Sequence, residues 1–248
     1  MQHFKVLNLQ LATSSTFDTM TTRLDISGLA FAFIVCVVLP AAAIRSARRA
    51  PVEPREVGMP QRLKTLSVLI VLAAIALIVA NRNDITLFPQ HQHATSHVTL
   101  GAAALLGILI LTELQLRSST PEERRELWLR QVVPERNADR VVWAVSSSIA
   151  GAAEEIIFRG TLFALLVALA GSATIAAAIS AAAFALAHYR QGWKNMGFVA
   201  AIALLFQWLV ISTASLVPAM VVHAIYNVAR GVRASRAMAT TEPRLPAA

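Results

Sequence analysis

The sequence predicts an all-α protein, a polytopic membrane bundle of about seven transmembrane helices (six to eight). Of its 248 residues, 56% are hydrophobic and 15% are charged, whereas an average soluble domain is about 45–50% apolar and 25% charged. The apolar residues fall in long runs separated by polar, arginine-rich segments, and about 20 such residues span a bilayer as a helix. One run also holds three charges within residues 151–160. Charges in such a place mark a candidate functional site.

The first three predicted spans are the apolar runs 26–44, 65–80 and 98–114. Pro40 interrupts the first run, which a membrane helix tolerates when neighbouring groups satisfy the freed carbonyl. A basic, proline-rich link and then a polar loop separate these runs. We interpret the three loop histidines as loop residues rather than metal ligands, and Glu113 near the end of the third run as an interfacial residue; the histidines are His91, His93 and His97.

Residues 116–140 are too polar to span a membrane. Thr120, Pro121 and Glu123 form the pattern of a helix start with a capping box. Apolar residues follow at helical spacing among arginines, so we expect a short amphipathic helix that lies at the membrane surface or is simply solvated.

Four further spans are predicted at 141–170, 173–188, 196–211 and 216–229. The sequence thus divides into four parts. We expect a polar N-terminal segment that is not a cleavable signal peptide, three accessory transmembrane helices with the basic link and the surface helix, a four-helix catalytic core, and a disordered basic tail; their bounds are 1–25, 26–140, 141–230 and 231–248.

The net charge of +8 follows the pattern of membrane topology. Nearly all lysines and arginines lie in four segments: 45–64, 115–140, 189–195 and 230–248. The positive-inside rule places these segments in the cytoplasm, with the N-terminus outside and the C-terminus inside. Because no recognition module or basic helix face is present, we exclude nucleic acid as a partner. The single cysteine, Cys36, excludes an intrachain disulfide.

Glu154, Glu155 and Arg159 are the charges inside the fourth run. Residues four apart share a helix face, so Glu155 and Arg159 can neutralise one another. Glu154 is rotated about 100° from Glu155 on an α-helix and lacks that partner. We interpret Glu155 and Arg159 as supporting residues and Glu154 as the candidate for proton transfer. The alternative is that both carboxylates only hold helices together.

Two more pairs, each at i,i+4 spacing, bring polar side chains into later runs. Phe184 can pack beside His188 at the end of the fifth run, and His223 shares a face with Asn227 in the seventh run. Mid-membrane polar groups either join helices or line a site. If the helices pack suitably, Glu154, His188, His223 and Asn227 can converge.

These residue types are suited to activating water. Glu154 can take a proton from water that an imidazole orients, and His223 and Asn227 can donate to an oxyanion. His188 and His223 could instead be ligands of a zinc ion that holds this water. The soluble zinc-protease and serine-hydrolase signatures are both absent. The residue types leave the choice between zinc and a metal-free Glu/His pair open.

In this order, Glu-Glu-x-x-x-Arg (154–159), Phe-x-x-x-His (184–188) and His-x-x-x-Asn (223–227) resemble the three motifs of the CPBP family, the CAAX prenyl proteases and bacteriocin-processing or immunity proteins also called the Abi family. The resemblance covers about residues 141–230. It implies an intramembrane endopeptidase with Glu154 as general base, His188 as its partner, and His223 with Asn227 as oxyanion donors or metal-site residues. Glu155 and Arg159 match the supporting part of the first motif.

The sequence therefore predicts an intramembrane endopeptidase. We expect it to hydrolyse a peptide bond near the C-terminus of a membrane-attached or hydrophobic peptide, either CAAX-like or bacteriocin-leader-like, with lipid and a peptide or lipidated protein as its partners. The alternative is a non-catalytic membrane interaction or bacteriocin-immunity protein. A transporter ranks last, because no internal repeat is present.

Overall fold

The computed structural model describes residues 24–49, 58–88, 94–129, 131, 133–134 and 137–241, and all secondary-structure elements in these ranges are helices. The predicted all-α class is confirmed. In chain order the elements are α1 (Ile26–Phe33), η1 (Ile34–Val38), α2 (Leu39–Arg48), α3 (Met59–Arg82), α4 (Ala94–Ser118), α5 (Pro121–Leu129), α6 (Asn137–Glu154), η2 (Glu155–Leu162), α7 (Phe163–Ala170), α8 (Ala173–Ala187), η3 (Tyr189–Gln191), α9 (Trp193–Thr213) and α10 (Val217–Thr241).

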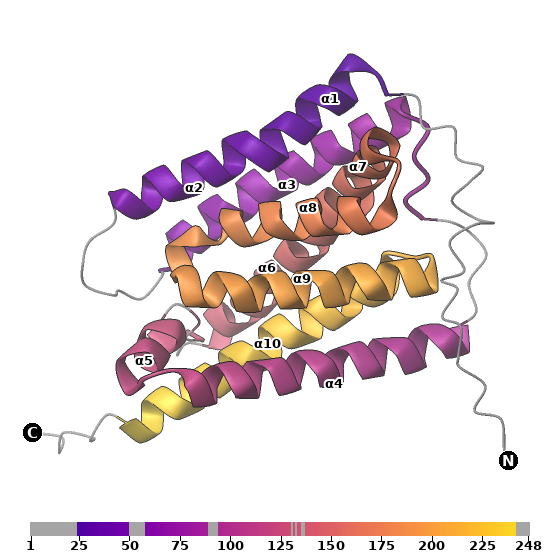
Figure 1. Cartoon of the computed structure of the whole chain (residues 1–248). Helices are drawn as coiled ribbons and strands as arrows, with labels where there is room; N and C mark the ends of the chain where they lie inside the picture. The colour runs from indigo at the N-terminus through magenta and orange to yellow at the C-terminus, as the bar shows by residue number, and fades with distance from the viewer. Residues whose placement is uncertain are drawn as a thin grey trace, which may run out of the picture.

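Long helices packed side by side form the bundle (Figure 1). The elements α1, η1 and α2 run on without a break, as do α6, η2 and α7. The second of these continuous helices packs against α3 and α10, while α8 packs against α7 and α9, and α9 against α4. The C-terminal ends of α2 and α10, the start of α3 and the short α5 lie at one end of the bundle, on the left in Figure 1.

Four of the described helices are long and apolar enough to cross a membrane by length and composition: Ile26–Arg48, Met59–Arg82, His97–Ser118 and Trp193–Thr213. The helix Ala173–Ala187 is apolar but shorter. The continuous helix formed by α6, η2 and α7, and the helix α10, are not among these four. A helix lies at each of the seven predicted spans, and seven membrane crossings stay a prediction.

The observed ends of several helices differ from the ends of the apolar runs that predicted them. The helix α3 begins at Met59 instead of 65, and α10 continues to Thr241 instead of ending near Ala229. Residues 231–241 are thus helical, and the prediction of disorder from 231 onward is wrong for them. Alanine, arginine and methionine extend a helix by their backbone propensity, even where the pattern is no longer apolar. Residues 242–248, and nearly all of 1–25, lie outside the described residues.

Two helices contain a wider π-helical stretch. In η1 the N–H of Leu39 donates to the carbonyl of Ile34, five residues earlier, directly before Pro40. Proline has no N–H to donate, so a local π-turn is one way to accommodate it. The second stretch, η2, begins at Glu155 and ends at Leu162. It coincides with the charged motif, and π-bulges are frequent at functional sites.

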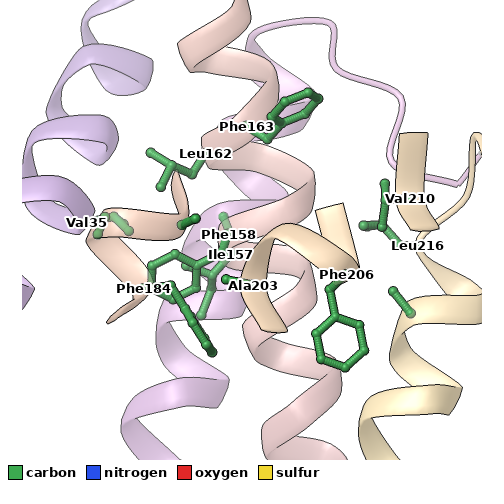
Figure 2. Close-up of a cluster of buried hydrophobic side chains, with 14 of the residues drawn as sticks. Val35, Ile157, Phe158, Leu162, Phe163, Phe184, Ala203, Phe206, Val210 and Leu216 are labelled. Carbon is green, nitrogen blue, oxygen red and sulfur yellow. The ribbon is translucent and has the colours of Figure 1, made fainter. Parts of the chain in front are cut away.

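The apolar core lies where η2, α8 and α9 meet (Figure 2). Phe158 and Phe184 pack edge to face with ring centroids 4.9 Å apart. Ile157 and Leu162 are fully buried beside them. This packing fixes the helix that carries the charged motif against the helix that ends at His188.

Hydrogen bonds stabilise the ends of the helices α1, α3 and α5. Asp25 caps α1 and bonds to the fully buried Asn83 at the end of α3, with Asp25 N–H donating to Asn83 Oδ1 at 3.0 Å. Hydrogen bonds from the Ser27 hydroxyl and the Gly28 N–H lower the pKa of Asp25 to about 2. The predicted capping box of α5 is present, because the N–H of Glu123 donates to Thr120 and the N–H of Thr120 donates to Glu123.

Candidate active site

Glu154, His188, His223 and Asn227 all line one cavity of about 230 Å³. Glu154 ends α6, His188 follows α8, and the other two lie on α10. The four-residue convergence expected from the sequence is therefore present in the geometry. The cavity wall also includes polar residues from the arginine-rich end of the bundle, namely Arg62, Gln131, Gln191 and Arg230.

His223 lies between the two adjacent glutamates. Its Nδ1 is 2.7 Å from Glu155 Oε1, and its Nε2 is 3.6 Å from Glu154 Oε2. A carboxylate accepts, so the proton of the shorter contact is on Nδ1. The ring of Phe206 stacks on the imidazole with centroids 4.9 Å apart. One ring face and both ring nitrogens of His223 thus contact neighbouring side chains.

Glu155 and Arg159 form the predicted i,i+4 ion pair, with Arg159 Nη1 at 3.3 Å from Glu155 Oε1 and both side chains buried. The Arg159 guanidinium also lies 4.2 Å from the centroid of the Phe184 ring. Glu155 therefore links a buried arginine to His223 through one oxygen.

The expectation that Glu154 faces away from Glu155 holds only in part. Both carboxylates reach the same imidazole. Glu154 is the last residue of α6, and Glu155 is the first residue of η2. A π-helix has more residues per turn than an α-helix, so consecutive side chains are separated by a smaller angle about the helix axis. Glu154 keeps some exposure to the cavity, whereas Glu155 has none.

His188 lies just past the C-terminus of α8, and its ring is held from one side. Its Nδ1 is 2.8 Å from the carbonyl of Phe184, and the Phe184 ring is 4.5 Å away. The predicted contact between these two residues is present. Since a carbonyl only accepts, Nδ1 carries the proton and Nε2 is the acceptor nitrogen. That leaves Nε2 to accept a hydrogen bond in the cavity.

Asn227 and His223 lie against α6, where α10 approaches closely. Asn227 Nδ2 donates to the carbonyl of Ser147 at 3.1 Å. A Cβ at Gly151 would be 3.1 Å from His223 Cγ and 3.3 Å from Asn227 Nδ2. A glycine at this position therefore allows the two helices to place both side chains at the cavity wall.

Sequence reasoning missed Gly151, Ser147 and Phe206 as residues that shape the site. A small residue one turn before the glutamates is a signal of close helix approach and could have identified Gly151. Nothing in the sequence could have identified Phe206, which comes from α9, or the backbone carbonyl of Ser147.

The donor set does not match a zinc site. Across the described parts of the chain, no group of three or more His, Cys, Asp or Glu side chains is arranged to hold a metal ion. Of the three histidines that we expected in the loop, His91 and His93 lie outside the described residues, and His97 lies near the start of the helix α4. No chemical step is therefore assigned to a metal.

A comparison of the sequence with models of known protein families matched one stretch of the chain. Residues 136–229 match the family model described as type II CAAX prenyl endopeptidase Rce1-like. This stretch contains all three motifs, and the resemblance to the CAAX protease family is confirmed. Searches of curated proteins and of solved structures found no match.

Proposed function

We propose that this membrane protein, whose residues 136–229 match the type II CAAX prenyl endopeptidase Rce1-like family model, hydrolyses a peptide bond near the C-terminus of a membrane-attached or hydrophobic peptide. The observation that carries the proposal is the single cavity that holds Glu154, His188, His223 and Asn227. The family match over these residues supports a protease in general. The residue roles, the water-activating mechanism and the substrate class are our proposals.

In the proposed reaction, Glu154 takes a proton from water and His188 Nε2 accepts a second hydrogen bond from the same water. The water oxygen then attacks the scissile carbonyl carbon. The C–N bond breaks, and Glu154 returns its proton to the leaving amine nitrogen. Such proton transfer contributes about 10²–10⁴-fold to the rate.

The oxyanion that forms during this attack needs donors. Asn227 Nδ2 has one N–H bonded to Ser147, and its second N–H is available to the oxyanion. When His223 is protonated on both nitrogens, Nδ1–H donates to Glu155 and Nε2–H can turn from Glu154 to the oxyanion. Losing one such donor costs about 10²–10³-fold in kcat in a comparable site.

The proposed orientation follows from the arginines. Arg62 and Arg230 on the cavity wall belong to two of the four basic segments, which the positive-inside rule places in the cytoplasm. We therefore propose that the cavity opens to the cytoplasm, with the N-terminus outside and the C-terminus inside.

The test is cleavage by the purified protein in lipid nanodiscs. A lipidated CAAX-type peptide and a bacteriocin-leader-type peptide are each incubated with the protein, and products are identified by mass spectrometry. We expect hydrolysis of one peptide bond by the wild type and by Glu113→Ala, whose carboxylate forms exposed ion pairs with Arg117 and Arg233. We expect at least about 100-fold slower cleavage by His188→Ala.

A non-catalytic role makes the opposite prediction. A protein that acts by binding a partner, as in bacteriocin immunity, cleaves neither peptide, and alanine at Glu154 or His188 leaves its phenotype intact. Cleavage by Glu154→Ala and His188→Ala at the wild-type rate would also reject the proposed mechanism.

Metal analysis separates the two mechanisms for water activation. We expect chelation to leave the rate unchanged, because the described donors do not form a three-ligand group. Zinc in the purified wild type, absent from His188→Ala and His223→Ala, would show instead that the two histidines hold a metal.

A further inference from the structure

A second cavity, of about 480 Å³, lies where the end of α4, the short helix α5 and the later part of α10 meet. These segments lie together at one end of the bundle (Figure 1). We call this space the α5 cavity, and its wall includes Arg117, Arg124, Arg125, Arg233, Leu116 and Trp128. Among the described residues, none lines both the α5 cavity and the candidate active site.

The wall of the α5 cavity has an excess of positive charge, since four arginines and two glutamates line it. One of the glutamates, Glu113, is already neutralised. Arg117 Nε is 3.0 Å from Glu113 Oε1, and Arg233 Nη2 is 2.7 Å from Glu113 Oε2. The second glutamate, Glu122, forms no ion pair within the described part of the chain. The cavity is therefore suited to an anion.

Arg124 and Arg125, which are adjacent on α5, are the two arginines of this wall that have no carboxylate partner in the described ranges. The Arg124 side chain donates a long hydrogen bond, 3.4 Å, from Nη1 to the carbonyl of Leu116. The Arg125 side chain is exposed and has neither a hydrogen bond nor an ion pair there. The donors of a guanidinium form a planar fork that matches the oxygens of a phosphate.

Apolar side chains form much of the remaining wall, namely Leu116, Pro121, Trp128 and Met238. Leu116 and Trp128 also line a smaller cavity of about 150 Å³, which reaches the buried residues Leu127 and Tyr226. A free phosphate would leave this apolar surface in contact with water. A phospholipid would cover the surface with its glycerol and the start of its acyl chains, while its phosphate lies at the arginines.

The position of the α5 cavity fits the headgroup region of a bilayer. The helix His97–Ser118 is long and apolar enough to cross a membrane, and Arg117 lies at its end. Headgroups lie at the ends of spanning helices, where tryptophan is also enriched. The positive-inside rule places the arginine-rich end of the bundle in the cytoplasm. The cytoplasmic leaflet is rich in anionic lipids, and basic pockets between membrane helices on that side bind their headgroups.

We propose that the α5 cavity binds the headgroup of an anionic phospholipid. Arg124 and Arg125 contact the phosphate oxygens, and Leu116 and Trp128 pack against the start of the acyl chains. A lipid bound in this way holds α5 against the bilayer. The site goes beyond the proposed function, because lipid binding here requires no step of proteolysis.

The experiment is native mass spectrometry of the purified full-length protein in detergent, titrated with phosphatidylglycerol or with phosphatidylcholine of the same acyl chains. We expect the first phosphatidylglycerol to bind about 10–50-fold more tightly than the first phosphatidylcholine, because each of two arginines near an anionic headgroup contributes about fivefold. In Arg124→Gln/Arg125→Gln this ratio should fall toward one. Arg124→Lys/Arg125→Lys should keep part of the preference, since lysine retains the charge without the fork.

The matched control is Arg48→Gln/Arg49→Gln. It removes two arginines from the same end of the bundle, at positions that do not line the α5 cavity. This variant should keep the wild-type ratio. Equal binding of the two lipids by the wild type, or an unchanged preference in Arg124→Gln/Arg125→Gln, would overturn the inference.

Two further measurements separate a bound lipid from a free anion. Trp128→Ala should weaken the binding of both lipids severalfold and leave their ratio unchanged, because the apolar contact is common to both. Inorganic phosphate at millimolar concentration should leave phosphatidylglycerol bound. Release of the lipid by inorganic phosphate would assign the α5 cavity to a free anion and overturn the lipid site.

Discussion

The N-terminal helices α1 to α4 and the C-terminal helices α6 to α10 differ in where they place polar and apolar side chains. In the apolar windows of α3 and α4, 22% of residues are buried, against 44% in α9. Large apolar residues are exposed on both sets of helices, for example Ile78 at 60% on α3 and Ile175 at 50% on α8. In η2 every residue except Ile156 is buried, including Glu155 and Arg159.

This difference shows what each region contacts. Apolar side chains that point away from the protein are expected where lipid surrounds it, since lipid tails are as apolar as leucine. Buried charges are costly and persist where they pair or serve a site. Both sets of helices present apolar side chains to their surroundings, and η2 in the C-terminal set also buries a charge pair.

The largest effect is expected from breaking the buried charge pair. Arg159→Met leaves the buried Glu155 without its guanidinium partner, and removing one member of a buried pair costs about 3–5 kcal/mol. Thermal unfolding in detergent measures the loss. The double variant Glu155→Gln/Arg159→Met should regain most of this stability. If Arg159→Met unfolds like the wild type, the polar interior of the C-terminal region does not depend on this pair.

The close approach of α6 and α10 predicts a smaller effect, on activity. In Gly151→Ala the new Cβ would be 3.1 Å from His223 Cγ, so the imidazole must shift, and we expect about tenfold slower cleavage from this misplacement. The control is Gly197→Ala on α9, where a Cβ meets nothing within 4 Å. Equal rates for the two variants would indicate that His223 has room to adjust.

The contact between the two regions can be weakened at one hydrogen bond. The Thr161 hydroxyl in η2 donates to the carbonyl of Ala76 in α3 at 3.1 Å. Thr161→Val keeps the shape and removes the donor, which should cost about 0.5–1.5 kcal/mol. Thr65→Val is the control, because Thr65 bonds within α3 at an exposed position. A larger loss in the control would contradict the buried contact.

The smallest effect is expected on the lipid-facing side of α3. Ile78→Ala should change the free energy of unfolding by less than about 0.5 kcal/mol, because lipid or detergent fills the space. The same change at the fully buried Ile157 should cost far more. Comparable losses at both positions would mean that Ile78 is covered by protein.

Much of the fold could be predicted because apolar runs directly reflect burial in lipid or protein. Each predicted run contains a helix, and the capping box at Thr120 is present. Helix ends could not be predicted as well, since residues beyond Ala229 extend α10 by local propensity rather than apolarity.

The sequence predicted those contacts of the candidate site that depend on i,i+4 spacing along one helix, such as the contact between Phe184 and His188. It was less predictable where the backbone departs from an α-helix, because the π-helical start at Glu155 brings both glutamates to His223. Contacts between distant helices, such as Phe206 on His223, depend on packing that no local pattern contains.

The role of Glu154 as the general base can be tested most directly by chemical rescue. Cleavage of the lipidated peptide is measured for the wild type and for Glu154→Ala, with and without added formate, a carboxylate small enough for the space vacated in the cavity. We predict at least about 100-fold slower cleavage by Glu154→Ala, with part of the rate restored by formate and no effect of formate on the wild type. Cleavage by Glu154→Ala at the wild-type rate would contradict a base at this position.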